Sequence, residues 1–122
     1  SDDPVLFLEP KQLYRQTFNK SPDPGPDFTI PFGVARHVRV GDDVTIVTLG
    51  RMVKLSNEVA DKLEGDGIGC TVVDLRTTSP LDEDTILESV AETGRLVVEF
   101  VGTQPIKLTH VKSVALKKKK RK

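Results

Sequence analysis

The feature that most constrains the fold is an alternation of apolar runs with amphipathic stretches between residues 44 and 98. Residues 44–49, 70–75 and 96–98 are rich in valine, isoleucine and leucine, which is typical of strands buried in a sheet. The third run extends at most to Val101. Because the connections are short, the order β-α-β-α-β predicts right-handed crossovers. The predicted fold class is α/β, a three-layer Rossmann-like parallel sheet.

Both predicted helices are bounded by start and stop signals. The apolar residues of the first recur every three or four positions from Met52, and Gly65-Asp66-Gly67 ends it, since glycine tolerates the left-handed conformation that caps a helix. The second helix begins after Asp82, a good N-cap residue, and ends at Gly94.

The segments outside this pattern suggest a division of the chain. Residues 5–8 form a short apolar run that predicts another strand, within a segment covering residues 1–19. Four prolines in residues 20–31 exclude a helix or a central strand there and predict an extended linker. The α/β domain is expected over residues 32–101. Residues 102–122 form a basic tail without periodicity, which we expect to be disordered.

The net charge of zero hides an asymmetry along the chain. Residues 1–106 hold all 18 acidic and 10 basic residues, whereas residues 107–122 hold eight basic residues and no acidic one. The acidic body argues against a nucleic-acid-binding core. The candidate polyanion-binding residues are Lys117, Lys118, Lys119, Lys120, Arg121 and Lys122. This run is also typical of a nuclear-import signal or of a solvated tail without a specific function.

The cysteine content limits the chemistry of the chain. A single cysteine, Cys70, excludes an internal disulfide and a metal site built from several thiolates. At a predicted strand start, Cys70 is expected to pack in the core rather than to react. We find no apolar run near the roughly 20 residues of a membrane helix and no secretion signal at the start. We therefore expect a cytoplasmic location, or the mitochondrial matrix if the source is eukaryotic.

Five sequence blocks resemble one known family. Phe7-Leu8-Glu9-Pro10-Lys11, with Leu13-Tyr14-Arg15 after it, resembles the β subunit of the E1 component of 2-oxo acid dehydrogenase complexes. The further blocks, in the same order as in the family, are residues 30–35 (IPFGVA), 43–48 (DVTIVT), 73–77 (VDLRT), and 79–82 (SPLD) running to 93–98 (TGRLVV). The resemblance covers residues 1 to about 99, and pyruvate and branched-chain enzymes share it.

The resemblance implies a role in assembly rather than in chemistry. The family enzyme uses thiamine diphosphate and Mg²⁺ for oxidative decarboxylation, with its catalytic glutamate in a pyrimidine-binding domain and the diphosphate site on the α subunit or α half. Residues 1–19 resemble only the end of that pyrimidine-binding domain, so we expect this chain alone to hold no catalytic, cofactor-binding or metal-binding residue. The rest resembles the transketolase-type C-terminal domain, and it is incomplete because the pattern departs from the family after Glu99.

The resemblance also implies partners. These are an E1 α subunit or α half and a second β copy, while the departure after Glu99 leaves no support for the family's E2 contact. Candidate interface residues are Asp74 and Arg76, at the carboxyl end of a predicted strand, and Tyr14 and Arg15. The other reading of Asp74 and Arg76 is a strand end in solvent.

Three further motifs have structural readings that we favour. Gly65-Asp66-Gly67 is similar to a Mg²⁺-binding motif of thiamine enzymes, but no asparagine follows it and it joins a helix to a strand. The turn at Gly50-Arg51-Met52 lacks the glycine pattern of a phosphate site. His37 and His110 have no nucleophile at a suggestive spacing and are expected to be structural or surface histidines.

Two alternatives to the E1 assembly role stay open. One is an independent interaction module whose basic tail binds polyanions, and the other is the C-terminal domain of another transketolase-like enzyme. The block at residues 8–11 argues against a deoxyxylulose-phosphate synthase. Because a sheet of three strands leaves its edges unpaired, we also expect marginal stability or self-association.

Overall fold

The computed structural model describes residues 2–6, 8, 9 and 11–100. The chain divides into two compact units, with the boundary between Ile30 and Pro31. In the described part, no helix is long and apolar enough to cross a membrane.

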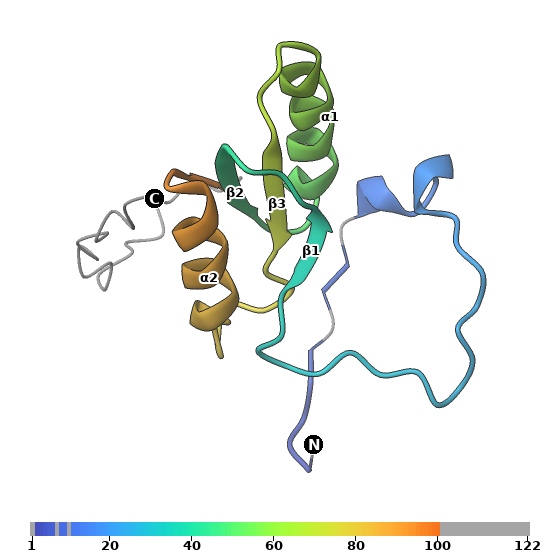
Figure 1. Cartoon of the computed structure of the whole chain (residues 1–122). Helices are drawn as coiled ribbons and strands as arrows, with labels where there is room; N and C mark the ends of the chain where they lie inside the picture. The colour runs from blue at the N-terminus through green and yellow to red at the C-terminus, as the bar shows by residue number, and fades with distance from the viewer. Residues whose placement is uncertain (1, 7, 10, 101–122) are drawn as a thin grey trace. The chain divides into compact units, whose positions relative to one another are not determined.

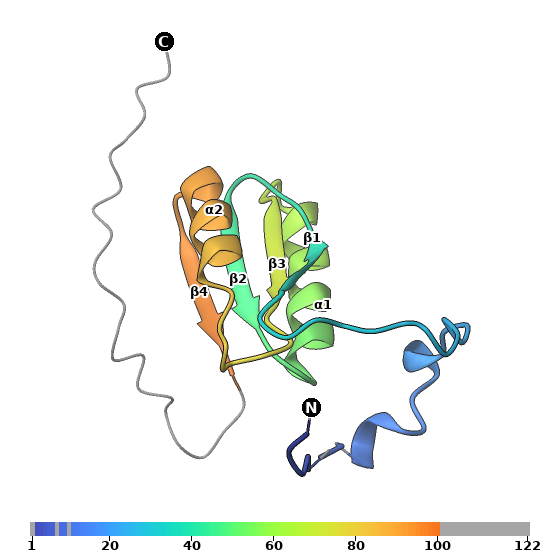
Figure 2. The ribbon, with the colours of Figure 1, turned by 90° about the horizontal axis from the view of Figure 1, so that it is seen from below.

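The second unit contains the elements that the alternating pattern predicts, together with one further strand. In chain order they are β1 (Arg36–Arg39), β2 (Val44–Thr48), α1 (Met52–Gly65), β3 (Cys70–Asp74), α2 (Glu83–Thr93) and β4 (Leu96–Glu99). They form a sheet with the strand order β1-β3-β2-β4 (Figure 2). Strand β2 is parallel to both of its neighbours, which confirms the predicted α/β arrangement of three parallel strands.

Strand β1 corrects the prediction of a purely parallel sheet. It pairs antiparallel with β3 and makes the sheet mixed and four-stranded. The sequence Arg-His-Val-Arg carries no apolar run, so nothing in its composition predicts a strand. It becomes a strand because β3 supplies its hydrogen-bonding partners. An edge strand pairs with a neighbour on one side only, so it tolerates charged side chains.

The core lies on both faces of this sheet, with one helix on each (Figure 1). On one face, Ala60 of α1 packs against Ile46 and Val72. On the other face, Ile86 of α2 and Leu81, which precedes that helix, pack against Val47 and Val73. Successive strand residues point to opposite faces, so parallel strands covered on both sides must be apolar at nearly every position.

The predicted caps of α2 are confirmed. The Asp82 side chain accepts a hydrogen bond from the backbone N–H of Thr85 at 3.1 Å, and Gly94 ends the helix with φ of 72°. Helix α1 ends at Gly65 with Asp66 as its C-cap, and Gly67 has φ of 79°. Gly65-Asp66-Gly67 is therefore the helix cap and turn that the sequence favours.

The first unit differs from its prediction. Its regular elements in the described residues are two 3₁₀ helices, Lys11–Leu13 and Thr17–Asn19. The strand predicted at residues 5–8 is wrong for Val5, Leu6 and Leu8, which are exposed and have no strand geometry. An apolar run becomes a strand only when another strand accepts its hydrogen bonds, and no described segment pairs with this one.

Candidate functional site

The candidate interface residues Asp74 and Arg76 lie in a tight turn directly after β3. The Asp74 carboxylate accepts a hydrogen bond from the backbone N–H of Arg76 at 3.2 Å. Arg76 has φ of 59°, the only positive φ at a non-glycine residue in the described part of the chain. A side chain in this conformation costs energy that the surrounding contacts must offset. The turn therefore fixes the backbone of the half-buried Arg76 at the carboxyl end of the sheet.

The loop after this turn is fastened to the segment that precedes β1. The backbone N–H of Gly33 donates to Thr77 Oγ1 at 2.9 Å, and that hydroxyl donates to the carbonyl of Pro80 at 2.9 Å. Gly33 has φ of 74°, and a Cβ there would lie 2.9 Å from Pro80 Cγ. Two segments that are more than 40 residues apart thus meet at this end, a contact that sequence reasoning missed.

Asp82 completes this junction. Its carboxylate accepts hydrogen bonds from the backbone N–H of Ala35 at 2.7 Å, and from the backbone N–H and the hydroxyl of Thr85. These bonds, the Ala35 bond foremost, lower the pKa of Asp82. An ionised carboxylate held by three donors joins segments well but is a poor proton carrier.

A polar row crosses the ends of the three parallel strands. Asp74, Thr48 and Glu99 are partners in register on β3, β2 and β4. Glu99 accepts a hydrogen bond from Ser56 of α1 at 3.2 Å, which places this row on the α1 face of the sheet. Thr48 is fully buried, and its hydroxyl finds no hydrogen-bond partner in the described residues. This row also escaped sequence reasoning, because strand register is set by pairing.

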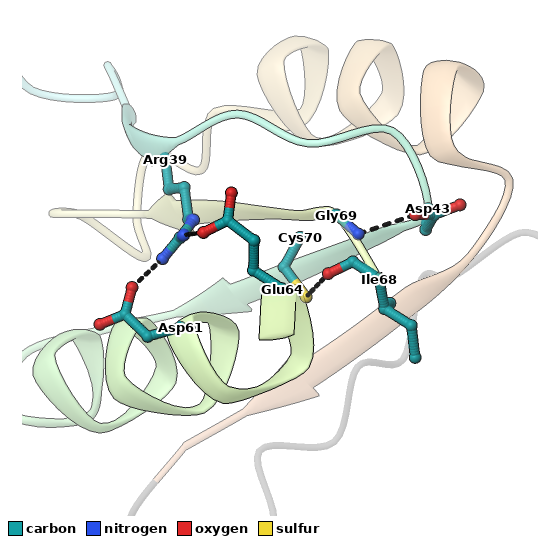
Figure 3. Close-up of polar contacts among 7 residues, drawn as sticks. All are labelled: Arg39, Asp43, Asp61, Glu64, Ile68, Gly69 and Cys70. Carbon is teal, nitrogen blue, oxygen red and sulfur yellow. Dashed lines mark hydrogen bonds and ion pairs between the residues drawn. The ribbon is translucent and has the colours of Figure 1, made fainter. Parts of the chain in front are cut away.

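The amino ends of the same strands are built for close packing. The Asp43 carboxylate accepts from the backbone N–H of Gly69 at 2.7 Å (Figure 3). On β1, Arg39 points toward α1 and forms ion pairs with Asp61 and Glu64 (Figure 3). Burial raises the pKa of the Cys70 thiol, which keeps it protonated and confirms its expected role in packing.

His37 and Ser89 contact each other, although no spacing in the sequence predicts this pair. His37 Nε2 lies 2.9 Å from Ser89 Oγ. The Ser89 hydroxyl donates its proton to the carbonyl of Thr85 at 2.7 Å, so it accepts from the histidine N–H. Ser89 is also buried. In this arrangement the imidazole is a donor and not a base, so the pair is not a nucleophilic one.

The remaining candidate residues lie elsewhere. Tyr14 and Arg15 are exposed residues of the first unit, where they border an open depression with Lys11 and Gln12. The structure therefore brings Asp74 and Arg76 together, while Tyr14 and Arg15 belong to the other unit. His110 and the basic run Lys117–Lys122 lie outside the described residues.

The residues present do not fit a Mg²⁺-diphosphate site. In Gly65-Asp66-Gly67, the backbone N–H groups of Asp66 and Gly67 donate to Leu63 and Glu64 as part of the helix cap. This turn also follows a helix rather than a strand, so it lies at the amino ends of the parallel strands. Across the described ranges, no three histidine, cysteine or acidic side chains gather in a metal-binding cluster.

The fold defines a class of domain, together with the strand-end junction, by which we mean the hydrogen bonds of Gly33, Thr77 and Asp82 at the carboxyl end of the sheet. Residues 33–100 match the family of transketolase C-terminal domains, and the chain belongs to this family.

Curated relatives place the chain more closely. It is 53% identical to a pyruvate dehydrogenase E1 component subunit beta from Rickettsia bellii, over 80% of this chain and 29% of the relative. A 2-oxoisovalerate dehydrogenase subunit beta from Bacillus subtilis is 43% identical, with the same coverage. An acetoin:2,6-dichlorophenolindophenol oxidoreductase subunit beta from Cupriavidus necator is 53% identical, over 80% of this chain and 28% of the relative. The chain thus spans less than a third of these relatives.

Solved structures are also similar in fold. One of them is described as a split gene transketolase, inactive beta4 tetramer. The TM-score is 0.58 and the identity 37%, over 62% of this chain and 25% of that one.

Proposed function

We propose that the chain is an assembly domain of an E1 β-like subunit, in an enzyme that decarboxylates 2-oxo acids oxidatively. The observation that supports this most is the range of its relatives. Beta subunits named for pyruvate, 2-oxoisovalerate and acetoin are 43–53% identical to it over the same 80% of the chain. A region shared at this level by enzymes with different substrates is expected to support the subunit rather than to select the substrate.

The geometry of the strand-end junction supports the same role. Its polar groups hold backbone segments together, as the hydrogen bonds of Thr77 and Asp82 show. Arg76, held in a strained backbone conformation beside Asp74, lies half-buried at this end of the sheet. Backbone strain of this kind clusters at functional sites.

The proposed partners are an E1 α subunit and a second β copy. The proposed contact residues are Asp74 and Arg76 in the α/β unit and Tyr14 and Arg15 in the first unit. Thiamine diphosphate and Mg²⁺ would act in the complete enzyme, held by residues other than those described for this chain. The proposed location follows that of the complex, the cytoplasm or the mitochondrial matrix.

Binding to a separately produced E1 α subunit tests this role. We expect the chain to associate with it in sedimentation velocity, and Arg76→Ala and Tyr14→Ala to weaken the association. Glu88→Ala is the matched control, because Glu88 is an exposed residue of α2 away from the strand ends. Lack of association, or turnover of a 2-oxo acid by the chain alone with thiamine diphosphate and Mg²⁺, would contradict the proposal.

A second candidate function rests on the eight basic residues in 107–122. We propose that this segment is able to bind polyanions such as nucleic acid by neutralising phosphates. Binding to a DNA duplex should then weaken steeply as salt rises, and should vanish when residues 107–122 are deleted. Binding that survives the deletion would contradict this second function.

A further inference from the structure

The two edges of the four-stranded sheet differ in how they are protected. The β1 edge carries Arg36 and Arg39, and its register shifts between His37 and Arg39. The ion pairs of Arg39 fasten it to α1, and the hydrogen bond of His37 to Ser89 fastens it to α2. Charged side chains and an irregular register are the usual means by which an edge strand avoids further pairing.

The β4 edge has the opposite character. Its residues Leu96, Val97 and Val98 are 41%, 48% and 39% exposed, so apolar side chains are open on both faces of the strand. Among the described residues, no strand lies beyond β4. An exposed apolar edge of this kind is a template for another strand.

Helix α1 widens this apolar surface. Its flank with Asp61 and Glu64 faces Arg39 on β1. Leu55 and Val59 lie on the opposite flank by helical period, on the side where Ser56 reaches Glu99 of β4. Both are partly exposed, at 46% and 39%. The apolar surface at this edge therefore comprises Leu55, Val59, Leu96, Val97 and Val98, and we call it the β4 edge surface.

The direction of the backbone groups restricts how a strand can join β4. The carbonyl of Arg95 accepts a hydrogen bond from the backbone N–H of Thr45 of β2, at 2.9 Å. Because these groups alternate sides along a strand, Arg95, Val97 and Glu99 turn theirs toward β2. Leu96 and Val98 therefore turn their N–H and C=O groups to the outer edge.

We propose that a second copy of this chain pairs antiparallel with β4, about a twofold axis at Val97. In this register Leu96 of one copy exchanges hydrogen bonds with Val98 of the other, and the two Val97 side chains face each other. Arg95 then lies opposite Glu99 at both ends of the pair. A register shifted by one residue would set the outward backbone groups of one copy against the inward backbone groups of the other. A register shifted by two residues would move Arg95 of one copy away from Glu99 of the other.

Arg95 and Glu99 both have hydrogen-bonding groups that can form this cross-strand ion pair. The Arg95 guanidinium is exposed and donates to the carbonyl of Asp43 at 3.1 Å, which leaves further N–H groups available. Within the described residues, Glu99 accepts a hydrogen bond from Ser56 on Oε2, and Oε1 is the atom proposed to accept from a cross-strand arginine. A twofold contact uses the same patch on both copies, which gives a closed dimer. This pairing supplies a contact for the second copy named among the proposed partners, but it is argued from the β4 edge and uses neither Arg76 nor an α subunit.

The first experiment measures the oligomeric state of the full chain by sedimentation equilibrium. We expect the wild-type chain to be a dimer and Val97→Lys to be a monomer, since a charge facing its own copy opposes pairing. Val40→Lys is the control, because Val40 is 71% exposed next to the β1 edge, and it should remain a dimer. A monomeric wild-type chain would overturn the proposal, and this result is expected if residues beyond Phe100 cover the edge. A dimeric Val97→Lys would overturn it as well.

The second experiment tests the register and is independent of any loss of folding in Val97→Lys. The two Val97 residues form a non-hydrogen-bonded pair with Cα atoms about 4.5 Å apart, within reach of a disulfide. On mild oxidation Val97→Cys should form a covalent dimer with the circular dichroism of the wild type. Val40→Cys should not, and the native Cys70 is buried. A Val97→Cys chain that stays uncross-linked would overturn this register.

Discussion

The Asp82 carboxylate accepts a hydrogen bond from the backbone N–H of Ala35 at 2.7 Å, and this bond joins the approach to β1 to the start of α2. Asp82 is also the N-cap of α2. One side chain therefore fixes both a helix terminus and the neighbouring segment that leads into the edge strand.

Replacing Asp82 by alanine should destabilise the fold. The change removes the cap and the bond to Ala35 together, which should lower the free energy of unfolding by about 2 kcal/mol. Urea denaturation followed by circular dichroism measures the change. Asp84→Ala, in the exposed first turn of the same helix, is the control and should cost only about 0.5 kcal/mol. Equal losses in the two variants would contradict the role given to Asp82.

The same residue should make stability depend on pH in the acid range. The pKa of Asp82 is lower in the folded chain than in the unfolded chain, so the folded state binds fewer protons. Its contribution is complete above the unfolded pKa of about 3.9 and is lost as the pH falls through the folded pKa. Asp82→Asn should flatten stability against pH below about 4. A slope unchanged in Asp82→Asn would exclude this linkage.

Arg76→Gly should raise the stability of the fold and weaken its assembly with a partner subunit. Glycine adopts the φ of 59° found here without strain, so the free energy of unfolding should rise by about 0.5–1 kcal/mol. Loss of the guanidinium should at the same time weaken binding to an E1 α subunit. Denaturation and sedimentation measurements on one preparation test both effects. A variant that is less stable would show that the left-handed turn is not strained.

Thr48→Val should stabilise the chain. The Thr48 hydroxyl is buried, without a hydrogen-bond partner in the described part, and valine has nearly the same shape. Removing the unsatisfied group should raise the free energy of unfolding by about 1 kcal/mol. Thr45→Val is the contrasting variant, because the buried Thr45 hydroxyl bonds the carbonyl of Ser89 and the hydroxyl of Thr93. It should destabilise, and a gain in both variants would contradict the reasoning.

Gly41→Ala should strain the junction between β1 and β3. A Cβ at Gly41 would lie 2.4 Å from the backbone nitrogen of Cys70, so the backbone must move, at a cost of about 2 kcal/mol. Gly65→Ala provides the comparison, since a Cβ there meets nothing within 4 Å. The thermal midpoint should fall for the first variant and stay level for the second. A similar midpoint for both would refute the close packing.

The order of helices and strands was predicted from local sequence patterns, whereas the contacts at the carboxyl ends of the strands were not. Asp82 and Gly94 are read as caps from the residue types alone, because a cap bonds its own helix terminus. The link between Gly33 and Thr77 spans 44 residues, and nothing near either one predicts it. The same limit explains the strand wrongly expected at residues 5–8.

By itself, the sequence determined the three parallel strands, the two helices and their ends. Hydrophobic period and capping act over a few neighbouring residues, so they are legible along the chain. Only the tertiary structure decided that Arg36–Arg39 forms a strand, that Thr48 aligns with Asp74 and Glu99, and that one sheet edge is charged while the other is apolar. These features depend on which segments pair, and pairing is settled by long-range packing and hydrogen bonding that a local pattern does not encode.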